Sequence, residues 1–211
     1  MDIPARSKIN RYPNRGNYDI NKLQEILDRN FVCQVAFEEE GQPFVIPMNF
    51  SHDPGHLYLH GSKESRIMSR MANGKQLAIS ILEVNGIVIR RRMADNSLLY
   101  VSAVLYGKGS EINDYESKMR TFKLLMDKMV HGRWEETERP DNRDMEKVMV
   151  VQFDIEDFSI KINENNVRET GGRTDLWYGI IPIKRTYGEP IAPSEIPVPD
   201  YIRKLITIKS A

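Results

Sequence analysis

A group of small, hydroxyl-bearing and basic residues follows an apolar stretch in the first third of the chain. The group comprises His60, Gly61, Ser62, Lys63, Ser65 and Arg66. Glycine lets a backbone approach a ligand closely, serine hydroxyls donate hydrogen bonds, and a guanidinium can hold two oxygens of one phosphate. The pattern favours an anion site where a strand meets a helix. The local alternative is a plain strand-to-helix connection with a serine N-cap and solvated cations, and the spacing excludes a P-loop.

The four histidines are the residues to test for metal binding. His52, His56 and His60 recur at every fourth position, which would align them on a helix. Pro54 and Gly55 lie between them, so we expect strands and a turn, in which the imidazoles do not converge. We therefore predict no metal site. His60 remains our one candidate for a catalytic side chain.

Other motifs of enzyme chemistry are missing from the sequence. It contains neither the Gly-x-Ser-x-Gly nucleophile elbow nor a Gly-x-Gly-x-x-Gly dinucleotide motif. The single cysteine, Cys33, lies in an apolar run and is predicted to be a buried, unreactive thiol. Trp177 and Tyr178 could stack on a flat ring, and core packing explains them equally well.

Composition limits the classes of partner. The 211 residues are 40% hydrophobic and carry a formal net charge of zero, which gives no electrostatic case for binding nucleic acid or acidic lipid. The first residues lack the apolar core of a secretory signal, and no window approaches the ~20 apolar residues of a membrane helix. We therefore expect a soluble, cytoplasmic protein.

Hydrophobic periodicity predicts three helices among many short strands. Asp19 is expected to cap a helix with its apolar face at Ile20, Leu23, Ile26, Leu27 and Phe31. Further helices are predicted over Ser65–Asn73 and Asp114–His131. Strands are predicted over Phe31–Phe37, Phe44–Phe50, His56–His60, Leu77–Leu82, Ile87–Arg91, Leu98–Tyr106, Val148–Ile155, Phe158–Ile162 and Leu176–Ile183.

The arrangement of these elements predicts a mainly β fold. The strands do not alternate regularly with helices, so we expect a closed antiparallel β-barrel with peripheral helices. Asn85-Gly86 is predicted to be a hairpin turn. Pro47 cannot donate a ladder hydrogen bond, which indicates an edge strand, a bulge or a ligand lying against the backbone.

The chain reads as a single domain over residues 1–211 with two appendages. Residues 1–18 are basic and resemble either a packed arm or a solvated tail, and Arg11, Arg15 and Tyr18 could contact a ligand or partner. Residues 186–211 form a proline-rich tail that ends in an apolar segment. The segment Asn163–Asp175 is polar and predicted to be a mobile loop.

Several of these motifs together, in this order, resemble the FMN-binding proteins of the pyridoxamine 5′-phosphate oxidase-like family. The nitroimidazole-resistance proteins are the subgroup of closest resemblance. The motifs are Tyr18-Asp19, Gly41-Gln42-Pro43-Phe44-Val45-Ile46-Pro47, Leu57-Tyr58-Leu59-His60-Gly61-Ser62 with Ser65-Arg66, His131-Gly132-Arg133-Trp134, and Trp177-Tyr178-Gly179-Ile180-Ile181-Pro182.

The resemblance implies a split β-barrel that forms a homodimer and binds FMN at the dimer interface. The strand Val45, Ile46, Pro47, Met48 and Asn49 would lie along the isoalloxazine ring, and the segment from His60 to Arg66 would hold the ribityl phosphate. Tyr100 and Ser102 would lie near the cofactor, and Trp177 would reach it from the partner subunit. This chain departs from the family at Leu99 and Val101, where members often carry Asn and Arg. That departure leaves another flavin, or a haem-like ligand, open.

The resemblance implies an FMN-dependent oxidoreductase of unknown substrate, in which the flavin carries the electrons. Two alternatives remain. One is a flavin-binding or storage module without catalysis, and the other is a dimeric interaction protein without a cofactor.

Overall fold

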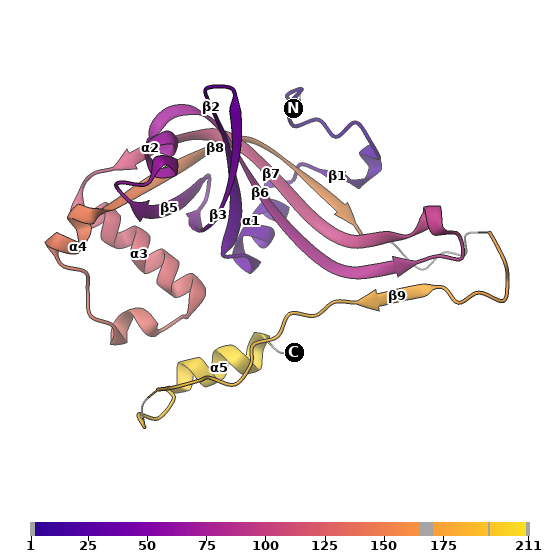
Figure 1. Ribbon diagram of the computed structural model, residues 1–211. Coiled ribbons are helices and arrows are strands. Elements are labelled where there is room, and N and C mark those ends of the chain that lie inside the picture. The colour runs from indigo at the N-terminus through magenta and orange to yellow at the C-terminus, as the bar shows by residue number, and fades with distance from the viewer. Residues whose placement is uncertain (1–2, 165–170, 194, 210–211) are drawn as a thin grey trace.

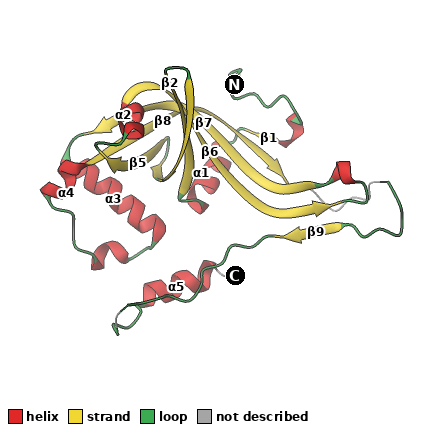
Figure 2. Cartoon of the chain, viewed as in Figure 1, coloured by secondary structure: helices red, strands yellow, loops and turns green. Residues whose placement is uncertain are grey.

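The computed structural model describes residues 3–164, 171–193 and 195–209 and is built around one antiparallel sheet of nine strands (Figures 1 and 2). The strand order is β3-β2-β6-β7-β8-β5-β4, with β1 paired to β8 and β9 paired to β6. The strands are β1 Gly16–Asn17, β2 Val32–Glu39, β3 Gln42–Asn49, β4 Ser51–Asp53, β5 His56–Ser62, β6 Asn73–Ile89, β7 Ser97–Ile112, β8 Val148–Asn163 and β9 Gly179–Pro182.

The helices agree with the expected ones and add two more. The helices are α1 Ile20–Arg29, α2 Arg66–Ala72, α3 Tyr115–Met129, α4 Asn142–Lys147 and α5 Asp200–Lys209. Asp19 caps α1 by accepting a hydrogen bond from the Asn21 backbone, which confirms the predicted cap. Short 3₁₀ turns lie at Pro13–Arg15, Met93–Asp95 and Arg133–Glu136.

The core lies inside the curved sheet and is closed at one end by α1. Alternate residues of β2, β5, β6, β7 and β8 face it, and the helix contributes Leu23, Ile26 and Leu27, all fully buried. Cys33 is also fully buried in the core, as predicted, and burial raises the pKa of its thiol to about 12. A mainly β, antiparallel fold is therefore confirmed.

The barrel is not closed, contrary to the sequence-based expectation. The end strands β3 and β4 form no ladder with each other in the described part of the chain. Among the described residues, strand β3 therefore pairs only with β2, and its other edge has no strand partner. Pro47 sits on this edge strand, which agrees with the first of the positions predicted for it.

The predicted hairpin turn at Asn85-Gly86 is wrong. Strand β6 runs through these residues, with an irregularity between Val84 and Gly86 where it pairs with β7. Gly86 instead faces Pro182 of β9, and a Cβ atom there would lie 3.0 Å from the Ile181 carbonyl oxygen. The glycine thus serves the close approach of a neighbouring strand.

The two strands predicted over Val148–Ile155 and Phe158–Ile162 form one strand, β8. A register shift against β7 lies between Tyr106 and Gly107, opposite the predicted break. At Gly107 a Cβ atom would overlap the Asp154 carbonyl oxygen. The bulge bends the long strands so that the distal half of the β6–β7 hairpin leaves the barrel (Figure 1).

The chain beyond β8 extends along this projecting hairpin. Strand β9 is shorter than the predicted Leu176–Ile183 and pairs with the distal part of β6. The tail then returns to α5, where Tyr201 lies against Gly132 and accepts a hydrogen bond from Arg133 at 3.3 Å. Parts of the predicted mobile loop (165–170) and of the tail (194, 210–211) lie outside the described residues.

Residues 3–17 pack against the sheet rather than forming a solvated tail. Arg6 donates a hydrogen bond to Asp157 at 2.7 Å, and β1 pairs with Ile160 and Lys161. The Ile9 backbone donates to the Tyr18 hydroxyl at 2.9 Å.

Within the described residues, none of the helices has the length and apolar character needed to span a bilayer.

Candidate functional site

The edge strand β3 and the connection from β5 to α2 form one continuous surface. Val45 on β3 is 62% exposed, and Asn49 and Met48 are partly exposed. Arg66, the first residue of α2, places its guanidinium carbon 4.2 Å from the centre of the Phe44 ring on β3. The structure therefore places Arg66 beside β3, the strand that carries the first group of predicted cofactor residues.

The β5–α2 connection is held by its own backbone. Lys63 donates to the Lys147 carbonyl and Ser65 donates to the Ser62 carbonyl, both at 3.0 Å. The Ser62 hydroxyl accepts from the Glu64 backbone at 3.2 Å. Ser65 precedes α2 without forming a side-chain cap, so its hydroxyl remains available to a ligand.

Gly61 has a packing role in this connection. A Cβ atom at this position would lie 3.0 Å from Cγ of Met68, which is fully buried. The glycine therefore allows α2 to pack closely on β5. This packing of α2 on β5 explains the glycine in the motif without a ligand, although a ligand could also approach its backbone.

His60 lies on the face of β5 that packs against α3. Its ring centre is 5.1 Å from that of Phe122, in an edge-on arrangement. Burial lowers the pKa of the imidazole, which favours the neutral form. The side chain is thus turned toward a helix, whereas its backbone remains part of the predicted anion-binding segment.

The third group of predicted residues lies on the projecting hairpin. Ser102 pairs with Lys161 of β8, and His60 pairs with Val150 of the same strand. These two positions are eleven residue steps apart on β8, which corresponds to about 35 Å along an extended strand. Across the sheet this group lies closer to β3. Val104, two residues from Ser102, pairs with Ser80 of β6, and Ser80 is joined through Gln34 of β2 to Pro47 of β3, three strand spacings or about 14 Å away.

Trp177 belongs to this distal group. It is 64% exposed and stands just before β9, where a Cβ atom on Gly179 would lie 2.7 Å from the indole ring. Core packing therefore does not explain this tryptophan.

Of the two positions that depart from the family, Val101 is buried in the core and Leu99 lies close to Gly86.

His52, His56 and His60 do not converge on one point. His52 faces Asp28 at 3.1 Å, and the His56 imidazole lies 3.0 Å from Asp53. His60 packs on Phe122, so the three occupy different surroundings. No group of three His, Cys, Asp or Glu side chains suited to a metal ion occurs among the described residues.

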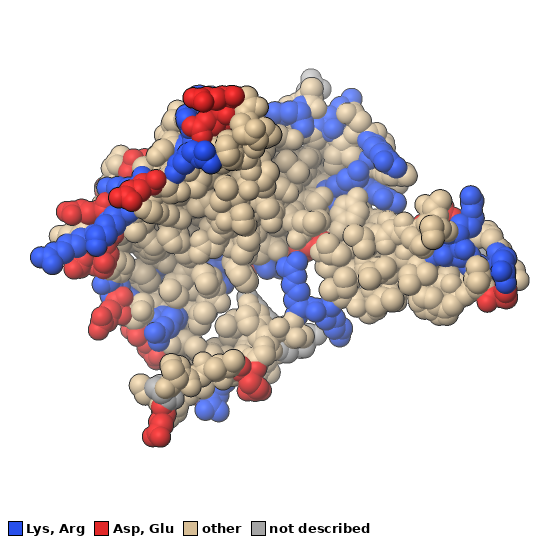
Figure 3. Space-filling model, in the orientation of Figure 1, with Lys and Arg blue, Asp and Glu red and all other residues tan. Residues whose placement is uncertain are grey.

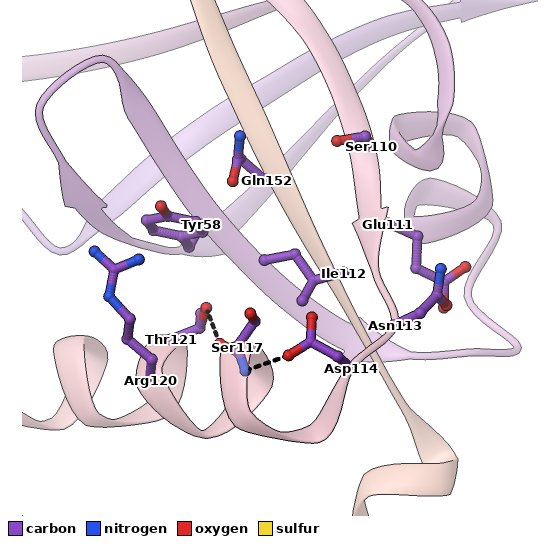
Figure 4. Close-up of a pocket in the computed structure, with 10 residues that line it drawn as sticks. All are labelled: Tyr58, Ser110, Glu111, Ile112, Asn113, Asp114, Ser117, Arg120, Thr121 and Gln152. Carbon is purple, nitrogen blue, oxygen red and sulfur yellow. Dashed lines mark hydrogen bonds between the residues drawn. The ribbon is translucent and has the colours of Figure 1, made fainter.

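A polar pocket lies where α3 meets the ends of β5, β7 and β8 (Figure 4). Its volume is about 300 Å³. Two of its lining residues, Tyr58 and Arg120, donate hydrogen bonds to Asp53 at 2.9 Å and 2.7 Å. Burial, followed by the hydrogen bond to Asp53, raises the pKa of the Tyr58 hydroxyl to about 12, although Arg120 opposes this shift. None of the predicted cofactor residues lines this pocket.

The largest cavity described, about 670 Å³, lies between the end of α1, the middle of β6 and the C-terminal tail. Glu83 is buried beside it and accepts hydrogen bonds from Asn30 at 2.5 Å and from Arg29 at 3.1 Å. Sequence reasoning did not identify this cavity. Its walls come from three distant segments, and no local motif marks such a meeting.

The comparisons with known proteins agree with this fold. Residues 19–162 match the profile of the pyridoxamine 5′-phosphate oxidase family. No match was found among curated proteins. The fold resembles that of a 5-nitroimidazole antibiotic resistance protein, so described, from Bacteroides thetaiotaomicron, with a TM-score of 0.57, 22% identity and coverage of 70% of this chain and 87% of that one.

Two solved structures match nearly the whole chain, and their coverage reaches into the C-terminal extension, the residues after 162. One is the FAD and haem binding protein from Mycobacterium smegmatis, with a TM-score of 0.84, 25% identity and coverage of 91% of this chain and 97% of that one. The other is a flavocytochrome from Azotobacter vinelandii, with a TM-score of 0.83, 25% identity and coverage of 95% and 96%. With its profile match extending over more than half of its length, the chain belongs to the pyridoxamine 5′-phosphate oxidase family.

Proposed function

We propose that this protein is a flavin-dependent oxidoreductase that binds its flavin between two copies of the chain. The FMN moiety, as FMN itself or as one half of FAD, lies along β3 with its phosphate at the β5–α2 connection. The two relatives that match most of the chain are named for flavin binding, which supports this choice of cofactor.

The observation that carries the proposal is the distance of Trp177 from β3 in one chain. Gly179, two residues after Trp177, pairs with Ile89 of β6. Ile89 is nine residue steps from Ser80, which pairs with β2, and this corresponds to about 30 Å along the strand. A single flavin ring along β3 cannot contact Trp177 of the same chain. A second copy whose distal hairpin lies over β3 would complete the site.

Exposed apolar side chains support this dimer. Several large ones lie on β3, on the distal hairpin and on the segment around β9, and large apolar patches of this kind mark interaction surfaces. They are Val45, Leu82, Ile87, Leu98, Trp177 and Ile181. The same strands carry the predicted cofactor residues.

The proposal is tested by purifying the protein and recording its absorption spectrum. We expect flavin bands, identification of the flavin by mass spectrometry after denaturation, and a dimer in analytical ultracentrifugation. Reduction by NADH or NADPH without oxygen, followed by reoxidation with an added acceptor, would distinguish an oxidoreductase from a storage module. A protein that stays colourless after incubation with FMN and FAD would refute flavin binding.

A second prosthetic group, haem, is favoured by the C-terminal extension. The two relatives named for haem or as a flavocytochrome cover 91% and 95% of the chain and so reach into this extension, whereas the nitroimidazole-resistance structure covers 70% of the chain. In this chain the extension ends in α5, which packs beside Gly132. The neighbouring His131 is exposed and has no hydrogen-bond or ion-pair partner among the described residues, and we propose it as the haem iron ligand.

Haem would add a one-electron carrier to the two-electron chemistry of a flavin. The test is a Soret band in protein produced with excess haem. His131→Ala should remove the band while the flavin bands persist. His56→Ala is the matched control, because that imidazole already contacts Asp53 at 3.0 Å. A Soret band that survives in the His131 variant would reject this ligand.

A further inference from the structure

The N-terminal arm is fixed to the sheet at both of its ends. At one end Arg6 is hydrogen-bonded to Asp157 at 2.7 Å and to Glu156 at 2.9 Å. At the other end Gly16 and Asn17 form β1 against β8. The segment between these anchors is therefore held against β7 and β8, and the side chains that it carries have defined positions.

Three cations of this region surround one aromatic ring. The guanidinium carbons of Arg15 and Arg11 lie 4.5 Å and 5.2 Å from the centre of the Tyr12 ring, and Nζ of Lys161 lies 5.9 Å from it. None of the three makes an ion pair with an acidic side chain in the described part of the chain. Glu164, the residue directly after β8, lines the adjoining cavity with Arg15.

The backbone of Tyr12 is strained. Its φ of 57° and ψ of 62° place it in the left-handed region, and the ring is 48% exposed. A non-glycine residue in this region costs about 1–3 kcal/mol. Like-charged side chains also repel one another when they gather without a counter-charge. A bound anion would offset the repulsion among the three cations, and the strained backbone at Tyr12 would serve to hold them around its site.

A cleft of about 250 Å³ opens beside this cluster. Its floor consists of the cross-strand pairs Ser102–Lys161 and Val104–Ser159, and its wall is the arm from Ile9 to Arg11. Figure 3 shows lysine and arginine side chains gathered over the arm, at the upper right of the view. Cations and hydroxyl groups therefore line the same cleft.

We propose that this cleft binds the pyrophosphate of an adenine dinucleotide. The inference rests on the proposed function, because Ser102 is both a predicted flavin contact and part of the cleft floor. FAD bound at the partner's β3 surface would thus extend its pyrophosphate toward Arg11 and Lys161. A nicotinamide nucleotide acting as electron donor carries the same pyrophosphate, and the experiment below distinguishes the two sources.

The experiment compares the wild-type protein with the double variant Arg11→Gln, Lys161→Gln. Arg143→Gln, an exposed cation on α4 outside the cleft, is the matched control. Flavin-free samples of each protein are titrated with FAD, FMN, NADPH and ADP. Thermal unfolding of each variant confirms that it folds. Arg11→Lys, which keeps the positive charge, tests whether charge alone is enough for binding.

Loss of the contacts to one phosphate should weaken binding about tenfold or more. We expect this loss for FAD in the double variant, with FMN affinity changed less than twofold and the control unchanged. A loss for NADPH alone would assign the cleft to the electron donor. Equal losses for FAD and FMN, or unchanged affinity for FAD, NADPH and ADP, would overturn the inference.

Failure of the proposed function gives a different result. If the wild-type protein binds neither FMN nor FAD, the flavin proposal fails. The cleft is then judged by ADP, which shares the pyrophosphate. Binding of ADP to the wild type and the control but not to the double variant would still support the cleft.

Discussion

Arg66 lies over the ring of Phe44, with its guanidinium carbon 4.2 Å from the ring centre and its Nε 3.6 Å from a carboxylate oxygen of Glu39. Glu39 also forms an ion pair with Arg70. The side chain of Arg66 is nevertheless 59% exposed. A bound phosphate would therefore meet a guanidinium that is already positioned by β3 and only partly neutralised.

Replacing Arg66 tests the predicted phosphate contact. Arg66→Ala should weaken flavin binding by roughly 1.5–3 kcal/mol, the contribution of a hydrogen bond to a charged group. The measurement is titration of the flavin-free protein with FMN. Arg70→Ala is the control, because Arg70 shares Glu39 but is not a predicted ligand contact. Equal affinities of the wild type and the Arg66 variant would remove this residue from the site.

Replacing Trp177 tests the contribution of the distal group. Because the side chain is 64% exposed, Trp177→Ala should leave the thermal unfolding midpoint of the isolated chain nearly unchanged. It should loosen the flavin and weaken the dimer, since we place it at the partner's cofactor. Flavin affinity and sedimentation are measured on one preparation. A variant with a clearly lower unfolding midpoint and unchanged flavin affinity below that midpoint would show that Trp177 acts in packing.

The sequence predicted the local elements well because their signals are local. Asp19 and the apolar face of α1 follow from capping and helical spacing, and the structure has both. The edge position of Pro47 follows from its missing N–H group. The β5–α2 connection was also found, because its residues are contiguous.

Long-range relationships were missed because no short motif encodes them. Asn85-Gly86 has the composition of a hairpin turn, but pairing with β9 holds Gly86 inside a continuous strand. The open barrel depends on which strands pair at the edges. The cleft between Arg11 and Lys161 joins residues 150 positions apart, and only the basic character of the arm indicated a ligand.

Gly107 should be intolerant of any side chain. A Cβ atom there would overlap the Asp154 carbonyl oxygen, so Gly107→Ala must displace β8 at the bulge. Overpacking of this kind costs about 1–3 kcal/mol. Chemical denaturation measures the change in the free energy of unfolding. Gly188→Ala is the control, since a Cβ atom there meets nothing within 4 Å; equal stabilities of the two variants would contradict the proposed cause of the bend.

His52 should make the fold sensitive to acid. Its Nδ1 atom is buried without a partner, and its Nε2 lies 3.1 Å from Asp28. Burial, followed by the positive charge of Lys128, lowers the pKa of the imidazole from 6.5 to about 4, although Asp28 opposes this shift. The folded protein therefore keeps His52 neutral at a pH where the unfolded chain already protonates it.

The sign of the effect follows from this difference. Below pH 6.5 the unfolded state binds the additional proton, so stability falls as the pH drops from 6.5 to about 4. The loss from this group amounts to about 3 kcal/mol at most, from the free energy equivalent of one pKa unit. Burial lowers the pKa of His60 as well, so it contributes in the same direction.

Urea denaturation at a series of pH values measures this dependence. His52→Gln should flatten the slope of unfolding free energy against pH in this window, whatever its effect on stability at neutral pH. His56→Gln serves as the comparison, because that imidazole lies at the surface between Asp53 and Asp154. An unchanged slope in the His52 variant would show that other groups account for the acid sensitivity, and that protons reach His52 in the folded protein.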